Sequence, residues 1–375
     1  MNTNLRTRLT QIWHQVQHNL FPFLVEIDVT LTPKVQEVVT VLEMLNIERF
    51  IESYYASGFA GRPNKDRLAI ARSFVARAVL NLPTTEALID RLKADISLRR
   101  VCGFSGTHAV PDKSRFSRAN AEFAKSKLPE HIHAALIAAH LGDQLIGHIS
   151  RDSTEIDARE RPKNKQKEKA EVPKSPPKKR GRPRKDAPVV VTEKELTRIE
   201  KQQTQSLAEM LRELPRGCDT GTKMNSKGYK TSWNGYKLHI DTADGDIPVS
   251  CILTSASMHD SGAMMPLMHQ TSAQVDYCYD LADAAYCSPL LRDASRELGH
   301  VPLIDHNPRR GEKNEFAPHE AERYKARSSA ERVNAHLKDN HGGRQIWVRG
   351  NEKVMAHLMF GILVITSEQL LRLIT

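Results

Sequence analysis

Residues 324–338 read Tyr324-Lys-Ala-Arg327-Ser-Ser-Ala-Glu331-Arg-Val-Asn-Ala-His-Leu-Lys338, which places one carboxylate among basic and aromatic side chains. At about 100° per residue, Arg327, Glu331 and Lys338 lie within about 60° of Tyr324, so all four share one stripe of a helix. A carboxylate that can hold a cation, flanked by groups that suit a phosphate backbone, is the set that DNA cleavage requires. The same spacing also suits an exposed helix on which Arg327 and Glu331 form an i, i+4 ion pair.

Two aspartates upstream complete a set of three acids. The segment Leu145-Ile-Gly-His-Ile-Ser-Arg-Asp152 predicts a strand that ends in an acid, and a second predicted strand runs into Asp283 and then into a helix. Acids at strand ends beside helix starts can converge at one edge of an α/β sheet, where ligand sites tend to lie. A single aspartate there more often caps a helix, but three acids in the order Asp152, Asp283, Glu331 favour a shared site.

Asp280 and Asp260 compete with these acids for a ligand role. Asp280 precedes Asp283 by three residues, so strand alternation points the two side chains to opposite faces of the sheet. Only one of the two can therefore be the ligand, and Asp283 is the prediction.

This combination of motifs resembles the DDE transposases of bacterial insertion sequences. Tyr324, Arg327, Glu331 and Lys338 match the family's spaced Tyr-Arg-Glu-Lys signature at every position. The run Asp283-Ala-Ala-Tyr286 matches the family's second-aspartate motif, although Cys287 stands where another acid is expected. Segments 233–239, 258–261 and 305–310 are similar to the family's intervening strand and loop motifs.

The resemblance implies an α/β fold, with an RNase H-like mixed five-stranded sheet flanked by helices and preceded by an all-α N-terminal DNA-binding domain. Alternation over residues 236–240 and an apolar run over 247–253, joined by a turn at Asp244-Gly-Asp246, predict a hairpin. With the Asp152 strand, these form three antiparallel strands. The strand that leads to Asp283 and another over 301–304 complete the sheet, and the apolar run 354–366 is predicted to be a buried last helix.

The resemblance also implies that Asp152, Asp283 and Glu331 are the catalytic residues and hold two Mg²⁺ or Mn²⁺ ions, about 4 Å apart. Clustered carboxylates are costly unless a cation joins them, and hard oxygen ligands suit these ions. The expected activity is DNA transposition, by hydrolytic cleavage at the element ends and attack of the freed 3′-hydroxyl on target DNA. Two alternatives are a transposase-derived DNA-binding protein without chemistry and an RNase H-like nuclease that cuts but does not join.

Composition agrees with a DNA partner. Lys and Arg number 55 against 45 Asp and Glu, which gives a net charge of +10 and favours a polyanion. The expected partners are double-stranded DNA, as terminal inverted repeats and target, and a second copy of the chain in the synaptic complex, with no membrane. Tyr324, Arg327 and Lys338 are the predicted DNA contacts of the catalytic region.

Five cysteines without paired spacing indicate a reducing compartment. The resemblance implies the bacterial cytoplasm, at the nucleoid.

The chain is predicted to divide into an N-terminal tail or helix (1–29), a helical DNA-binding domain (30–142) and a catalytic domain (143–375). A basic linker over 157–229 interrupts the catalytic domain. Residues 163–185 are dense in Lys, Arg and Pro and cannot bury a core, which is typical of disordered linkers. A capping box at Thr192-Glu-Lys-Glu195 predicts a helix that continues to about Leu214.

Within this linker, Arg180-Gly181-Arg182-Pro183 resembles an AT-hook. Gly181 lets the backbone enter a narrow minor groove, and Arg180 and Arg182 follow the enhanced negative potential of A/T tracts. A bare basic linker is the alternative.

Overall fold

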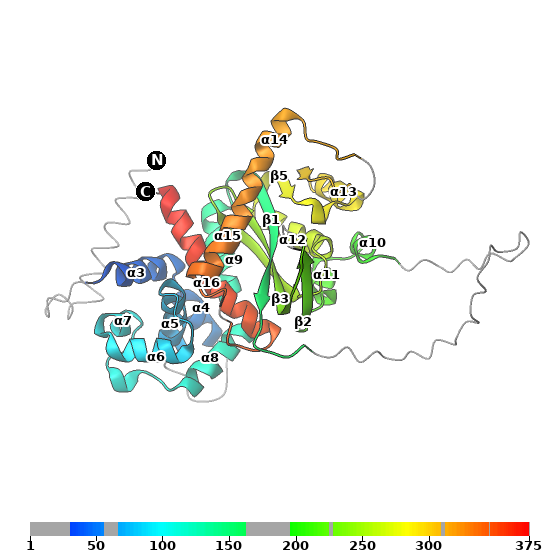
Figure 1. Ribbon diagram of the computed structural model, residues 1–375. Helices are drawn as coiled ribbons and strands as arrows, with labels where there is room; N and C mark the ends of the chain where they lie inside the picture. The colour runs from blue at the N-terminus through cyan, green and yellow to red at the C-terminus, as the bar shows by residue number, and fades with distance from the viewer. Residues whose placement is uncertain are drawn as a thin grey trace, which may run out of the picture.

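The computed structural model describes residues 31–55, 67–162, 196–224, 228–308, 312–344 and 346–374. Its N-terminal part is helical and the remainder is built on a mixed sheet with helices on both faces, as predicted (Figure 1). The N-terminal elements are α3 (Pro33–Leu45), α4 (Glu48–Tyr55), α5 (Arg67–Val79), α6 (Thr85–Ala94), α7 (Ile96–Val101), η2 (Thr107–Ala109), α8 (Lys113–Lys125) and α9 (Leu128–Leu141).

The predicted five strands are present in the predicted arrangement. They are β1 (Leu145–Asp157), β3 (Lys230–Ala243), β4 (Ile247–Ser255), β5 (Asp276–Ala282) and β6 (Val301–Ile304). Strands β1, β3 and β4 pair antiparallel, whereas β5 pairs parallel with β1 and β6 parallel with β5. A sixth strand, β2 (Asp219–Met224), was not predicted. It pairs with the first half of β3, on the edge that β4 occupies farther along.

The hairpin between β3 and β4 turns at the predicted residues. Gly245 and Asp246 take left-handed backbone angles, with φ of +80° and +61°, as tight hairpin turns require. The Asp246 carboxylate accepts hydrogen bonds from Ser329 Oγ at 2.7 Å and from Arg332 Nε at 2.8 Å. The turn therefore holds the start of α15 (Ser328–Asn340) against the sheet.

Helices cover both faces of the sheet. Helices α15 and α16 (Asn351–Ile374) pack on one face, where they share an apolar core with β1, β3 and β4. Helices α12 (Ser261–Ser272) and α13 (Pro289–Glu297) pack on the other. Between β6 and α15 the chain forms α14 (Pro318–Tyr324) and the 3₁₀ turn η4 (Lys325–Arg327).

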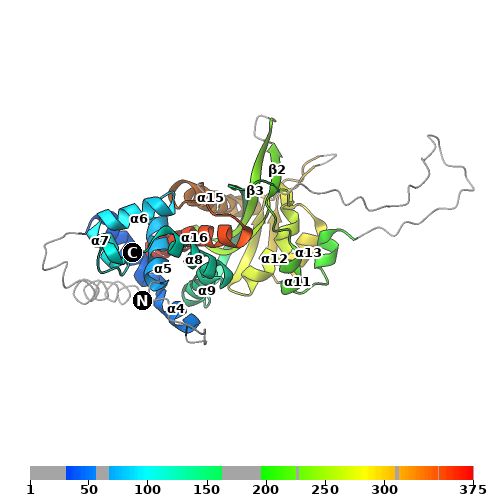
Figure 2. The ribbon, with the colours of Figure 1, turned by 90° about the horizontal axis from the view of Figure 1, so that it is seen from below.

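Helix α16 contains the predicted apolar run and joins the two parts of the molecule. It is long and apolar enough to cross a membrane, yet 78% of its most apolar window is buried inside the protein. Figure 2 shows α16 between the N-terminal helices and the sheet. Phe360 on this helix packs against Phe74 on α5, with ring centroids 5.5 Å apart. The N-terminal helices and the sheet therefore share one continuous apolar core.

The predicted single helix up to Leu214 is two short helices. Helix α10 (Arg198–Gln202) starts at a capping box of Thr197 and Glu200, and α11 (Leu207–Glu213) at a capping box of Ser206 and Glu209. The second capping box restarts the helix because its side chains satisfy a new set of free backbone N–H groups. Both helices pack on α12, whereas the predicted cap at Thr192–Glu195 lies outside the described residues.

Candidate active site

The register of the parallel strands sets Asp152 beside Asp283. Pairing of β1 with β5 ends at Arg151 and Ala282, and the next residue of the chain after each of these is an aspartate. The prediction that the strand ends at Asp152 is wrong, because β1 continues along β3 until Asp157 pairs with Gly235. Asp152 instead marks the point where β5 stops and one edge of β1 becomes free.

Burial and mutual repulsion make both carboxylates harder to ionise. Burial raises the pKa of Asp152 to about 6, and the charge of Asp283 adds to the rise. Burial also raises the pKa of Asp283, and the charge of Asp260 adds to it. Asp283 caps η3 (Ala284–Tyr286), because its Oδ1 accepts from Ala285 N at 2.9 Å. Two partly buried carboxylates that disfavour each other's charge form a set of hard oxygen donors that a divalent cation would stabilise.

The segment that carries the third acid is anchored to the same two strands, close to the point where their pairing ends. Tyr324 Oη donates to the Ala282 carbonyl at 3.2 Å, and Ser150 Oγ donates to the Arg327 carbonyl at 2.6 Å. The prediction of one continuous helix over 324–338 is wrong, because η4 separates α14 from α15. The tighter 3₁₀ geometry changes the helical phase at this point.

Glu331 lies in the first turn of α15 with 53% of its side chain exposed. It pairs with Arg327, as the alternative interpretation of the spacing predicted. The Arg327 guanidinium lies 5.9 Å from the centre of the Tyr324 ring, and its charge lowers the pKa of both Asp152 and Asp283. Tyr324, Arg327 and Glu331 are thus linked in one chain of contacts beside the aspartate pair.

One further residue of α15 contacts Asp152 and was not among the predicted site residues. Asn334 Nδ2 donates to Asp152 Oδ2 at 2.9 Å, and this hydrogen bond lowers the pKa of Asp152 against the effect of burial. Asn334 follows Glu331 by three residues, so both lie on the same side of the helix. The three-residue spacing between Glu331 and Asn334 is the sequence signal that could have identified Asn334.

Lys338 lies one helical turn farther on and contacts a different acid. Its Nζ lies 3.1 Å from Glu155 on β1, and Lys223 approaches the same carboxylate at 2.6 Å. Burial opposes ionisation, but the two lysines lower the pKa of Glu155 to about 2. The signature lysine is therefore committed to an ion pair at the edge of the site.

A cavity of about 420 Å³ opens at this edge of the sheet and is lined by both aspartates. Its other lining residues are Ser153, Glu155, Thr220, Thr222, Lys223, Trp233, Lys237, Ala256, Ser257, Met258, His259 and Asp260. Glu331 is outside this lining set. The Trp233 ring lies against β2, where a Cβ on Gly221 would approach it to 2.4 Å. The cavity therefore combines carboxylates with lysines and an aromatic face.

Asp260 is a fourth acid in this cavity, but its charge is already balanced. Its Oδ1 lies 2.9 Å from Lys237 Nζ and accepts from Ser153 Oγ at 2.8 Å. Burial opposes ionisation, but the charges of His239 and Lys237 outweigh it and lower the pKa of Asp260. A carboxylate paired with a lysine has less need of a metal ion than Asp152 or Asp283.

The competing aspartate, Asp280, belongs to a buried network on the opposite face. The fully buried Arg151 contacts Asp241 at 2.6 Å and Asp280 at 3.2 Å. Ser295 Oγ also donates to Asp280 at 2.6 Å. These contacts place Asp280 in the interior, so of Asp280 and Asp283 only Asp283 lines the cavity.

The hook residues Arg180, Gly181, Arg182 and Pro183 lie outside the described residues.

Comparison with known proteins gives two family matches. The family described as Transposase DDE domain matches residues 143–366, and the family described as Transposase domain (DUF772) matches residues 26–122. The first match covers the sheet, all three acids and α16 up to Thr366, and the second covers much of the N-terminal helical part. No curated protein and no solved structure matches this chain.

Proposed function

This chain belongs to the Transposase DDE domain family, and on that premise we propose that it cuts DNA at the ends of an insertion sequence and joins the freed 3′ ends to target DNA. Membership implies transposase activity, and therefore DNA binding. The family generally uses divalent metal ions. The cutting and joining steps, the ions and the residues that hold them are the proposal.

The observation that carries the proposal is the adjacency of Asp152 and Asp283 at the end of the β1–β5 pairing. Their charges repel, and burial raises the pKa of both. A site in which two acids each oppose the other's ionisation is unfavourable for the fold alone, and such perturbed groups mark functional sites.

Asp152, Asp283 and Glu331 would hold Mg²⁺ or Mn²⁺. When bound, two such ions activate water and stabilise the leaving 3′ oxygen. Asn334 holds one oxygen of Asp152 in place, and the Ala285 N–H does the same for Asp283. Arg327 pairs with Glu331, so a movement of Arg327 toward a phosphate would release this carboxylate toward the aspartate pair.

The rim of the cavity supports a nucleic-acid partner. Lys223, Lys237 and Trp233 line it, and lysines with an aromatic ring suit a phosphate backbone and an unpaired base. Tyr324 on α14, Arg327 on η4 and Lys338 on α15 would extend this surface, and the hook at 180–183 would add affinity for A/T-rich duplex. The proposed assembly contains two copies of the chain on DNA at the bacterial nucleoid.

The test is incubation of the purified full-length chain with Mg²⁺ and a linear fragment that carries one element end. Cleavage followed by joining to a target plasmid is the expected result. Cleavage without joining would replace the proposal with a nuclease on the same fold, and binding without cleavage would replace it with a DNA-binding protein that lacks chemistry.

A further inference from the structure

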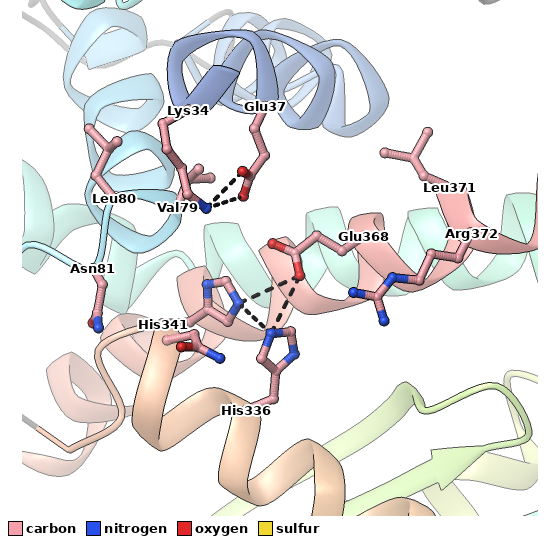
Figure 3. Close-up of a pocket in the computed structure, with 11 residues that line it drawn as sticks. Lys34, Glu37, Val79, Leu80, Asn81, His336, His341, Glu368, Leu371 and Arg372 are labelled. Atoms are coloured by element: carbon pink, nitrogen blue, oxygen red, sulfur yellow. Dashed lines mark hydrogen bonds and ion pairs between the residues drawn. The ribbon is translucent and has the colours of Figure 1, made fainter. Parts of the chain in front are cut away.

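A cluster of two histidines and a glutamate lies apart from the acid cavity. His336 is on α15, His341 caps the end of the same helix, and Glu368 is on α16. Figure 3 shows the three side chains converging, with α3 across the cavity. Each offers a metal-ligating atom, and these atoms all lie within 4.8 Å of one another.

The spacing of the three ligating atoms fits a metal ion. His336 Nε2 and His341 Nε2 are 3.3 Å apart, and they lie 3.7 and 3.6 Å from Glu368 Oε2. The circle through three atoms so separated has a radius of about 2.0 Å, which matches Zn–N and Zn–O bonds of about 2.0–2.2 Å. The triangle therefore has the size of one face of a zinc coordination sphere.

His341 is already oriented for ligation. Its Nδ1 lies 3.2 Å from the carbonyl oxygen of Ala78, at the end of α5. A carbonyl only accepts, so Nδ1 carries the hydrogen, and the nitrogen left to bind a metal ion is Nε2, which faces the cluster. A backbone carbonyl that fixes the tautomer and ring plane is a usual partner of a metal-ligating histidine. His341 is also 4% exposed, which limits its movement.

The surroundings leave room for access and for a further ligand. The cluster lines a cavity of about 660 Å³ together with Lys34 and Glu37 of α3. The two cations of this lining are both engaged, because Lys34 Nζ lies 2.8 Å from Glu37 and Arg372 donates to Gln369 Oε1 at 3.3 Å. A water molecule entering from the cavity would fill the fourth position of a tetrahedral site.

We infer that His336, His341 and Glu368 bind one divalent transition-metal ion of the Zn²⁺ type. Two imidazole nitrogens and one carboxylate suit Zn²⁺ better than Mg²⁺, which requires oxygen ligands and a larger shell. The ion would join α15 to α16 and, through Ala78, to the end of α5. Because Glu331 precedes His336 by five residues on α15, the ion would also stiffen the helix that carries the third acid.

The test measures zinc binding to the full-length chain, without DNA. The protein is stripped with a chelator and dialysed into excess Mg²⁺, which competes for the acid cavity. Zn²⁺ is then titrated against a chromophoric chelator, and Co²⁺ is added in parallel to record its visible spectrum. We expect one Zn²⁺ per chain, a four-coordinate Co²⁺ spectrum and a rise in Tm that grows with zinc concentration.

The variants His336→Gln and Glu368→Gln assign the site. Each removes a ligand, so each should weaken zinc affinity by more than the roughly 10–100-fold that loss of an outer partner costs, and should remove the Tm rise. The exposed residues His131→Gln and Glu352→Gln are the controls, and circular dichroism without metal verifies the fold. Zinc affinity within about threefold of the parent in both cluster variants, or no four-coordinate Co²⁺ spectrum in the parent, would overturn the inference. Neither result depends on DNA cleavage.

Discussion

Asn334 on α15 donates a hydrogen bond of 2.9 Å to Asp152 on β1. This contact joins the helix that carries Glu331 to the strand that carries the first aspartate, and it opposes the rise in the pKa of Asp152 that burial causes. Asn334 therefore connects the helix of Glu331 to the aspartate pair, and it lowers the pKa of Asp152.

Replacement of Asn334 by Ala should shift the pH dependence of cleavage. Loss of the hydrogen bond raises the pKa of Asp152 above its value of about 6, so a higher pH is needed to ionise the carboxylate. At subsaturating Mg²⁺, where the metal-free carboxylate has to ionise before it binds the ion, the acid limb of the single-turnover rate should move up by about one to two pH units. A hydrogen bond to a charged group contributes about 1.5–3 kcal/mol, and one pH unit corresponds to about 1.4 kcal/mol. Asn340→Ala on the same helix is the control. An unchanged acid limb in Asn334→Ala would remove Asn334 from the site.

Replacement of Asp152 by Asn should stabilise the metal-free chain at neutral pH. The folded-state pKa of about 6 exceeds the unfolded value, so the ionised carboxylate destabilises the fold. That cost is absent below about pH 4, grows as the pH rises through 6 and then stays constant. Urea unfolding in chelator should show a gain of about 1–3 kcal/mol at pH 8 and little gain at pH 4. An equal gain at both pH values would mean that the effect is unrelated to ionisation.

Replacement of Glu331 by Ala should abolish cleavage and preserve binding of the element end. The reason is that the proposed metal site loses its third carboxylate, whereas the aspartate pair and the fold remain. Glu322→Ala on α14 is the matched control, because Glu322 is also exposed and paired with a basic neighbour, Lys325. Cleavage by Glu331→Ala at the rate of Glu322→Ala would show that Glu331 only forms a surface ion pair.

Replacement of Arg327 or Lys338 by Ala should weaken engagement of the cleaved end. If each contacts one phosphate, the slope of log K against log salt should fall by about one for each variant. Lys338 has to leave Glu155 to make this contact. Lys325→Ala, in the same segment, should keep the parent slope. Parent-like slopes in both test variants would show that Arg327 and Lys338 face solvent and contact no phosphate.

Much of the fold could be predicted because each core strand has a local signal. Alternation marks β3, the Asp244–Asp246 turn marks the hairpin, and the apolar run within α16 marks a buried helix. Strand β2 escaped prediction because it is short, largely exposed and paired only with part of β3. The continuation of β1 beyond Asp152 left only a weak signal, the alternating burial of Thr154 and Ile156, and it is fixed by pairing with β3.

The site was predictable as a set of residues and not as a set of contacts. Sequence order identified Asp152 and Asp283, but only the register of β1 with β5 shows that they are neighbours. Strand alternation predicted that Asp280 points away, whereas its burial against Arg151 required the tertiary structure. The same holds for Glu368, which meets His336 and His341 only because α16 packs on α15.

The most direct measurement is cleavage of an end fragment by the double variant Asp152→Asn, Asp283→Asn, with Mg²⁺ or Mn²⁺ at saturating DNA. The proposed site predicts that this variant binds the end and makes no cut with either ion, while Asp276→Asn, at the exposed start of β5, cuts like the parent. Cleavage by the double variant at the parent rate would contradict the proposal that these two aspartates hold the ions that cut DNA.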